Sequence, residues 1–212
     1  MTLIPSPQQV VAAHRPLLRV IVEAVRRGTL HAQDYADWMD ESTDRALAPA
    51  LVRKGARRYL IAKEQDVHDE EEFDYEAEFL SNLGLAISAD GVQIRILRSA
   101  QGNLLPVPGH SIARQGFYEQ YGLPFDEAPA GTTDTLATYV RLVLHWSTDA
   151  EYNLERVYLG CPKSGALTRE SVQAHWDWPI WRRHDVTADG QIQAEVIDLD
   201  IYLEGEATGS EG

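Results

Sequence analysis

Histidine and aspartate residues near the C-terminal end of the chain offer the clearest prospect of acid–base chemistry. The stretch from His175 to Asp185 reads HWDWPIWRRHD and places a histidine beside an aspartate at each end. An imidazole oriented by a carboxylate is a common general base. Close neighbours in sequence seldom face one another in a regular element, so a distant group such as His145 would have to join them. Our candidate catalytic residues are therefore His145, His175 and Asp177, in a metal-assisted hydrolase or nuclease.

The same stretch is also rich in tryptophan and arginine, which gives it a second interpretation. Trp and Arg are the residues most enriched at the energetic centres of protein interfaces. Large aromatic side chains also fill protein cores, so the sequence leaves core packing, partner contact and catalysis open here. Core packing is the first interpretation of these tryptophans. If the stretch contacts a partner instead, the predicted patch consists of Trp176, Trp178, Trp181, Arg182 and Arg183.

The acidic run 64–78 and Cys161 contain residue types that can bind metals or act as nucleophiles, but their spacing and surroundings in the sequence do not favour either role. The acidic run 64–78, which contains His68, could supply oxygen ligands to a metal, but it lacks the spacing and the central glycine of a calcium loop. We expect a solvated acidic face there and predict no metal site and no cofactor. Cys161, two residues before Lys163, could be a nucleophile only if its pKa were lowered. An isolated cysteine at a strand end is more often a small buried apolar residue.

The charge of the chain indicates what kind of partner it would attract. The net charge is −14 over 212 residues. Residues 1–63 hold ten Lys or Arg against six Asp or Glu, whereas residues 64–212 hold nine against 27. A strongly negative surface repels nucleic-acid phosphates and attracts basic proteins. We therefore expect a basic protein partner, with any nucleic-acid contact confined to residues 1–63.

Composition also bears on the cellular compartment. The apolar segment from Leu17 to Val25 is too short to cross a membrane and is interrupted by Arg19 and Glu23. The N-terminus lacks the basic region of a signal peptide, and a single cysteine argues against a disulfide framework. Of the basic residues, 16 are Arg and three are Lys, a bias typical of bacteria with GC-rich genomes. We expect a bacterial cytoplasmic protein with no membrane association.

Helical spacing of apolar residues dominates the first third of the chain. It predicts a helix over 7–27, starting or kinking at Pro16 and ended by Gly28. A short helix is expected over 31–39 with Tyr35 and Trp38 on its apolar side, and another over 43–58, which Pro49 would make start nearer 48. The segment 59–62, Tyr-Leu-Ile-Ala, is predicted to be a short strand.

Alternating apolar residues predict a sheet in the remainder. Residues 83–98 alternate on both sides of Asp90-Gly91, the pattern of a β-hairpin. A second hairpin is expected over 138–159, with Leu142, Leu144 and Trp146 on one face and Arg141, Val143 and His145 on the other. Short helices are expected over 111–121 and 168–180, a loop over 162–171 and a last strand over 192–203.

These elements predict an α+β protein in which an N-terminal helical segment packs on a mainly antiparallel sheet built from hairpins. Residues 1–63 would form the mildly basic helical segment, 64–203 the acidic α+β domain and 204–212 a disordered tail. Our first functional hypothesis is a protein-interaction module of the antitoxin, immunity-protein or accessory-regulator type. The alternatives are the metal-assisted hydrolase or nuclease and a DNA-binding regulator acting through residues 1–63. A homodimer also remains open.

Overall fold

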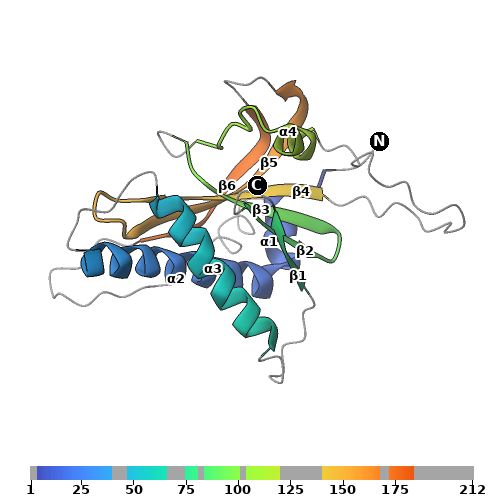
Figure 1. Ribbon diagram of the computed structural model, residues 1–212. Helices are drawn as coiled ribbons and strands as arrows, with labels where there is room; N and C mark the ends of the chain where they lie inside the picture. The colour runs from blue at the N-terminus through green and yellow to red at the C-terminus, as the bar shows by residue number, and fades with distance from the viewer. Residues whose placement is uncertain are drawn as a thin grey trace, which may run out of the picture.

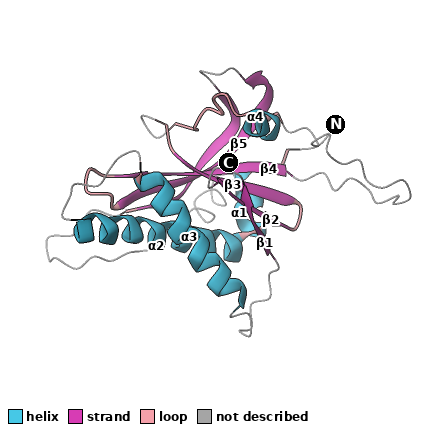
Figure 2. Ribbon diagram, viewed as in Figure 1, coloured by secondary structure: helices cyan, strands magenta, loops and turns pink. Residues whose placement is uncertain are grey.

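The fold was analysed in a computed structural model, which describes residues 4–39, 47–65, 75–80, 84–100, 104–119, 140–167 and 172–183. It has four helices and one six-stranded sheet among these residues, which confirms the predicted α+β class (Figures 1 and 2). The helices are α1 (Pro7–Ala13), α2 (Arg15–Met39), α3 (Ala48–Gln65) and α4 (Ile112–Tyr118). The strands are β1 (Tyr75–Leu80), β2 (Gly84–Ala89), β3 (Val92–Arg98), β4 (Val140–Thr148), β5 (Leu154–Leu167) and β6 (Val172–Arg182).

The N-terminal helices follow the predicted apolar stripe, with two corrections. A capping box formed by Ser6 and Gln9 starts α1. The helical pattern is interrupted at His14, just before Pro16, and α2 begins at Arg15. The prediction that Gly28 ends the helix was wrong, because α2 continues to Met39. A β-carbon at Gly28 would lie 2.2 Å from the carbonyl oxygen of Val52 on α3. Gly28 therefore serves a close crossing of two helices, for which a glycine inside a helix is suited.

The predicted strand over 59–62 was also wrong, since these residues are the penultimate turn of α3. Val52, Ala56 and Leu60 are fully buried at intervals of four residues, so the apolar stripe of the helix runs through the segment. A short apolar run cannot be assigned to strand or helix from its own composition, and here the helix that precedes it decides.

The six strands lie in the sheet in their chain order, β1 to β6. The hairpin predicted around Asp90-Gly91 is confirmed as β2 and β3, and Gly91 adopts the positive φ of 68° that its turn requires. The second predicted hairpin is confirmed as β4 and β5. All neighbouring strands pair antiparallel except β3 and β4, which are parallel and are joined by a connection that contains α4.

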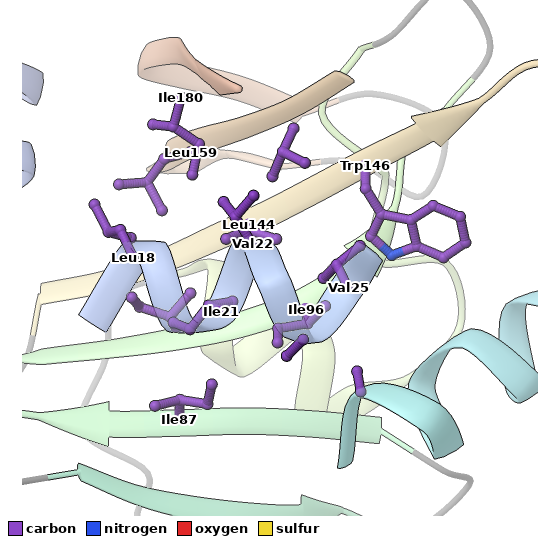
Figure 3. Packing of buried hydrophobic residues seen from close by; sticks show 14 of the residues in the cluster. Leu18, Ile21, Val22, Val25, Ile87, Ile96, Leu144, Trp146, Leu159 and Ile180 are labelled. Atoms are coloured by element: carbon purple, nitrogen blue, oxygen red, sulfur yellow. The ribbon is translucent and has the colours of Figure 1, made fainter. Parts of the chain in front are cut away.

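One face of the sheet is apolar and is covered by the first three helices. In Figure 3, Leu18, Ile21, Val22 and Val25 of α2 lie over Ile87, Ile96, Leu144 and Leu159 of the strands. All of these residues are buried in one continuous apolar cluster that contains residues of α1, α2 and α3 as well as of the sheet. Helices α1, α2 and α3 are thus joined to the strands by a shared core.

The opposite face of the sheet is covered in part by α4 and by the segment 104–110 that precedes it (Figure 1). Leu105, Phe117 and Tyr118 pack there against Leu97 of β3 and Val143 of β4, in a second and smaller apolar cluster. The alternation predicted for β4 is confirmed, because Leu142, Leu144 and Trp146 belong to the first cluster. Arg141, Val143 and His145 face the other way.

The C-terminal part of the sheet differs most from the prediction. Residues 172–182 form strand β6, where a helix was expected, and β5 extends to Leu167 across much of the expected loop. The tryptophans at 176 and 178 alternate with charged residues, a period of two that fits a strand. The predicted strand over 192–203 and the predicted tail over 204–212 lie outside the described residues. Among the described helices, none is both long and apolar enough to cross a membrane.

Candidate functional site

A hydrogen-bonded chain of Ser99, His145 and Asp177 lies on the α4-covered face of the sheet. The Nε2 atom of His145 is 2.8 Å from Oδ1 of Asp177, and its Nδ1 atom is 2.8 Å from Oγ of Ser99. The imidazole is fully buried and stacks on the ring of Tyr158, with 5.2 Å between centroids. A neutral imidazole satisfies both contacts when Nε2 donates to the carboxylate and Nδ1 accepts from the hydroxyl.

Three strands position this chain. Ser99 follows the last residue of β3, and its amide donates to the carbonyl of Trp146 on β4, which continues the parallel pairing by one residue. Asp177 of β6 pairs with Gly160 of β5. A β-carbon at Gly160 would lie 3.1 Å from Oδ1 of Asp177, so a glycine at this position leaves room for the carboxylate to reach across β5 to His145.

Serine, histidine and aspartate in this order resemble the groups of a nucleophilic hydrolase, in which the histidine activates the hydroxyl. Such a site also needs a ring that the substrate can reach and free N–H groups to stabilise an oxyanion. His145 has no exposed surface. The amides of Ser99 and Ala100 already donate to Trp146 and Leu104. These features favour a structural role, in which the chain of hydrogen bonds ties the end of β3 to β4 and β6.

The structure brings together two of the three candidate catalytic residues, His145 and Asp177. His175 lies two residues before Asp177 on β6 and is exposed, and no hydrogen bond joins it to the other two. Sequence reasoning missed Ser99, because its approach to His145 depends on the parallel pairing of β3 with β4. The described part of the chain holds no group of three or more His, Cys, Asp or Glu residues suited to a metal ion.

The predicted partner-binding patch is divided between the core and the surface. Trp181 is buried in the main core, and Trp176 and Trp178 are half-buried against it. The indole N–H of Trp176 donates to the carbonyl of Pro5, 3.0 Å away. Arg182 is exposed, whereas Arg183 pairs with Asp149 at 2.9 Å. In the folded chain Trp181 thus offers no surface to a partner, and the indole N–H of Trp176 is already bonded within the chain.

Cys161 lies on β5 in the main core and is fully buried. Burial raises the pKa of its thiol to about 12, so the reactive thiolate is scarce at neutral pH. Lys163 is exposed on the same strand and is not among the causes of this shift. Cys161 therefore behaves as the buried apolar residue that its isolation in the sequence favours.

A different tryptophan is the most prominent exposed aromatic residue. Trp38, in the last turn of α2, is 77% exposed, and Tyr35 lies beside it with 6.0 Å between ring centroids. Met39, four residues after Tyr35 and therefore on the same side of the helix, is 40% exposed. We call Tyr35, Trp38 and Met39 the Trp38 patch. The separate short helix expected over 31–39 was wrong, because these residues are the last turns of the continuous α2, on which Trp38 faces outward.

Carboxylates surround the Trp38 patch. Asp34 and Asp37 are exposed on the same helical turns. The side-chain amide of Gln33 donates to the carbonyl of Glu151 and to Asn153, which holds the turn between β4 and β5 against this end of α2. That turn adds the exposed Glu151 to the same end of the molecule. In Figure 1 the C-terminal end of α2 lies beside the β4–β5 turn at the left of the view.

Comparison with known proteins gives no assignment. No protein family matches the chain, and no curated protein and no solved structure is significantly similar to it.

Proposed function

We propose that this protein is an interaction module that binds a basic protein partner through the Trp38 patch and its acidic rim. The observation that carries the proposal is that Trp38, in the last turn of α2, is 77% exposed. The ring of Tyr35, on the same helix, lies beside it. Trp is the residue most enriched at interface hot spots, and a rim of charge around an apolar centre is the usual anatomy of an interface.

Charge determines the class of partner. The chain carries a net charge of −14, Asp34 and Asp37 are exposed on the same turns of α2 as the patch, and the turn that holds Glu151 lies against this end of the helix. Complementary charge speeds association and rejects acidic proteins, although it adds less to affinity. The partner that fits is a protein with a positively charged surface around an apolar cleft able to accept an indole ring.

The proposal keeps the class of function that the composition predicts and moves the contact surface. Trp181 is buried, so the anchor is a residue of α2 and not of β6. In the N-terminal helices, Arg26 and Arg27 both pair with Glu23, at 2.6 and 2.7 Å, which neutralises part of the basic charge predicted to contact DNA.

Capture of the partner followed by measurement with purified proteins tests the proposal. The tagged full-length chain is used to isolate a stoichiometric partner from the source organism at moderate salt, and binding is then measured by calorimetry. We expect a basic partner whose affinity falls about 30-fold or more with Trp38→Ala, the loss of a hot spot worth ~2 kcal/mol. Ile112→Ala is the matched control, because Ile112 is 85% exposed on α4 and lies outside the patch.

Three results would contradict the proposal. The first is an affinity that Trp38→Ala and Ile112→Ala change equally. The second is a partner that is acidic, or one whose association rate does not fall when Asp34 and Asp37 are both replaced by Asn. The third is a dimer in light scattering that Trp38→Ala converts to monomer, which would assign the patch to a second copy of the chain.

A further inference from the structure

Two arginines of the sheet flank one aromatic ring on the α4-covered face. The Cζ atom of Arg95 on β3 lies 4.8 Å from the centroid of Phe117, and that of Arg141 on β4 lies 5.7 Å from it. Arg141 is 8% exposed and donates through Nη1 to the carbonyl of Gly116 at 3.1 Å. The attraction of a cation to an aromatic face is weak compared with the cost of removing a guanidinium from water.

Arg95 is half-buried, and one of its N–H groups has no partner in the part of the chain that the structure describes. Its Nε atom is buried and has no hydrogen-bond partner within the described ranges. Buried charged groups are ordinarily paired and hydrogen-bonded, because an unsatisfied N–H loses its bond to water without replacement. The Nε–H group of Arg95 can therefore donate a hydrogen bond, and no acceptor for it is found among the described residues.

The surroundings of Arg95 are positively charged. Burial lowers its pKa most, and the positive charge of Arg114 on α4 lowers it further. Tyr118 and Glu78 act in the opposite direction, each with a smaller effect than Arg114, and Arg141 adds a smaller lowering. Arg114 lies three residues before Phe117 on α4, a spacing that places both on one side of the helix, so three arginines lie near this ring.

We infer that Arg95, Arg114 and Arg141 form a binding site for a small anionic ligand, recognised through a phosphate or carboxylate group. The guanidinium presents N–H groups in a planar fork that matches two oxygens of either group, and charge-assisted hydrogen bonds of this kind are about twice as strong as neutral ones. An anion would satisfy the Nε of Arg95 and reduce the repulsion that Arg114 exerts on it. This inference is independent of the proposed partner binding.

Calorimetric titration of the full-length chain with sodium phosphate and, in a second arm, sodium succinate tests the site. Sodium chloride holds the ionic strength constant. We expect saturable binding in at least one arm, a rise in the melting temperature with the same ligand, and at least a tenfold loss of affinity with Arg95→Met. Arg98→Met is the matched control, since Arg98 is on the same strand but lies over Tyr152, at 5.5 Å from its ring centroid.

A second variant separates recognition from folding. Arg95→Lys keeps the charge and removes the fork, so it should fold like the wild type and bind more weakly than the wild type. Binding in the phosphate arm alone assigns a phosphate ligand, and binding in the succinate arm alone assigns a carboxylate ligand. Absence of saturable binding in both arms overturns the inference, as does an affinity that Arg95→Lys leaves unchanged or that Arg98→Met lowers equally.

Discussion

The two faces of the sheet are stabilised by different kinds of contact. The face under α1, α2 and α3 has an apolar centre, in which Ile94, Leu142 and Leu144 are fully buried. The face under α4 mixes a small apolar cluster with the arginines at 95 and 141 and the His145 chain. Successive residues of β4 thus serve opposite purposes, since a strand alternates its side chains between the faces. Hydrophobic burial is nondirectional, whereas the polar face depends on particular hydrogen bonds.

Adjacent residues of β4 allow a direct test of this difference, and the largest effect should come from the apolar side. Leu144→Ala removes a fully buried side chain from beneath α2 and leaves a cavity. We expect the free energy of unfolding to fall by about 2–5 kcal/mol, measured by urea denaturation. Leu104→Ala, at a 65% exposed position, should change it by less than ~0.5 kcal/mol. Equal effects of the two changes would contradict the assignment of this face as the core.

The helix crossing that completes the apolar face should be the next most sensitive point. Gly28→Ala places a β-carbon 2.2 Å from the carbonyl oxygen of Val52, so α2 and α3 must separate. We expect a loss of about 1–3 kcal/mol in unfolding free energy, although alanine is intrinsically the better helix former. The control is Leu30→Ala, two residues further on and partly exposed. A gain in stability from Gly28→Ala would show that the helices do not cross this closely.

On the polar face, His145→Leu tests the hydrogen-bonded chain. The change removes both bonds from a buried ring, but Asp177 is 28% exposed in its side chain and can turn to water. We therefore expect a loss of about 1–2 kcal/mol, smaller than that for the neighbouring Leu144→Ala. Ser99→Ala, which removes one of the two bonds, should have about half the effect. If His145→Leu left the free energy of unfolding unchanged, packing alone would stabilise this face of the sheet.

The smallest effect is expected at the turn between β4 and β5, where stability should depend on pH. Burial alone would raise the pKa of Asp149, but hydrogen bonds from Asn153 and Glu151 and the charge of Arg183 lower it overall. A lowered pKa means that the carboxylate stabilises the fold above its unfolded-state pKa, and that this contribution disappears as the pH falls through the folded-state value.

Comparison of Asp149→Asn with the wild type at pH 7 and at pH 3 measures this contribution. The ion pair with Arg183 is about one-third exposed and is screened by water, so we expect a loss of at most about 1 kcal/mol at pH 7. The difference should shrink at pH 3. A difference that grows on acidification would have the wrong sign for a carboxylate held ionised by the fold.

Several elements follow from local sequence alone. The hairpin around Asp90-Gly91 combines alternating apolar residues with a turn that needs positive φ, and both signals lie within 16 residues. The alternation in β4 assigned Leu144 and His145 to opposite faces for the same reason. In contrast, the aromatic stretch 172–182 was predicted to be a helix although Trp176 and Trp178 have the period of two of a strand, because so short an aromatic run does not by itself distinguish strand from helix.

The sequence by itself determined the class of the fold, the two hairpins, the N-terminal apolar helical stripe and the strongly acidic character of the chain. These depend on the periodicity and composition of neighbouring residues, which local sterics and burial convert directly into helix or strand. Only the tertiary structure decided that Gly28 lies where α2 crosses α3 and that Trp38 faces outward. It also decided that Arg95 and Arg141 both lie over the ring of Phe117. It also brought Ser99 to His145. Each of these depends on which distant elements pair and pack, and those choices are made by the free energy of the whole chain.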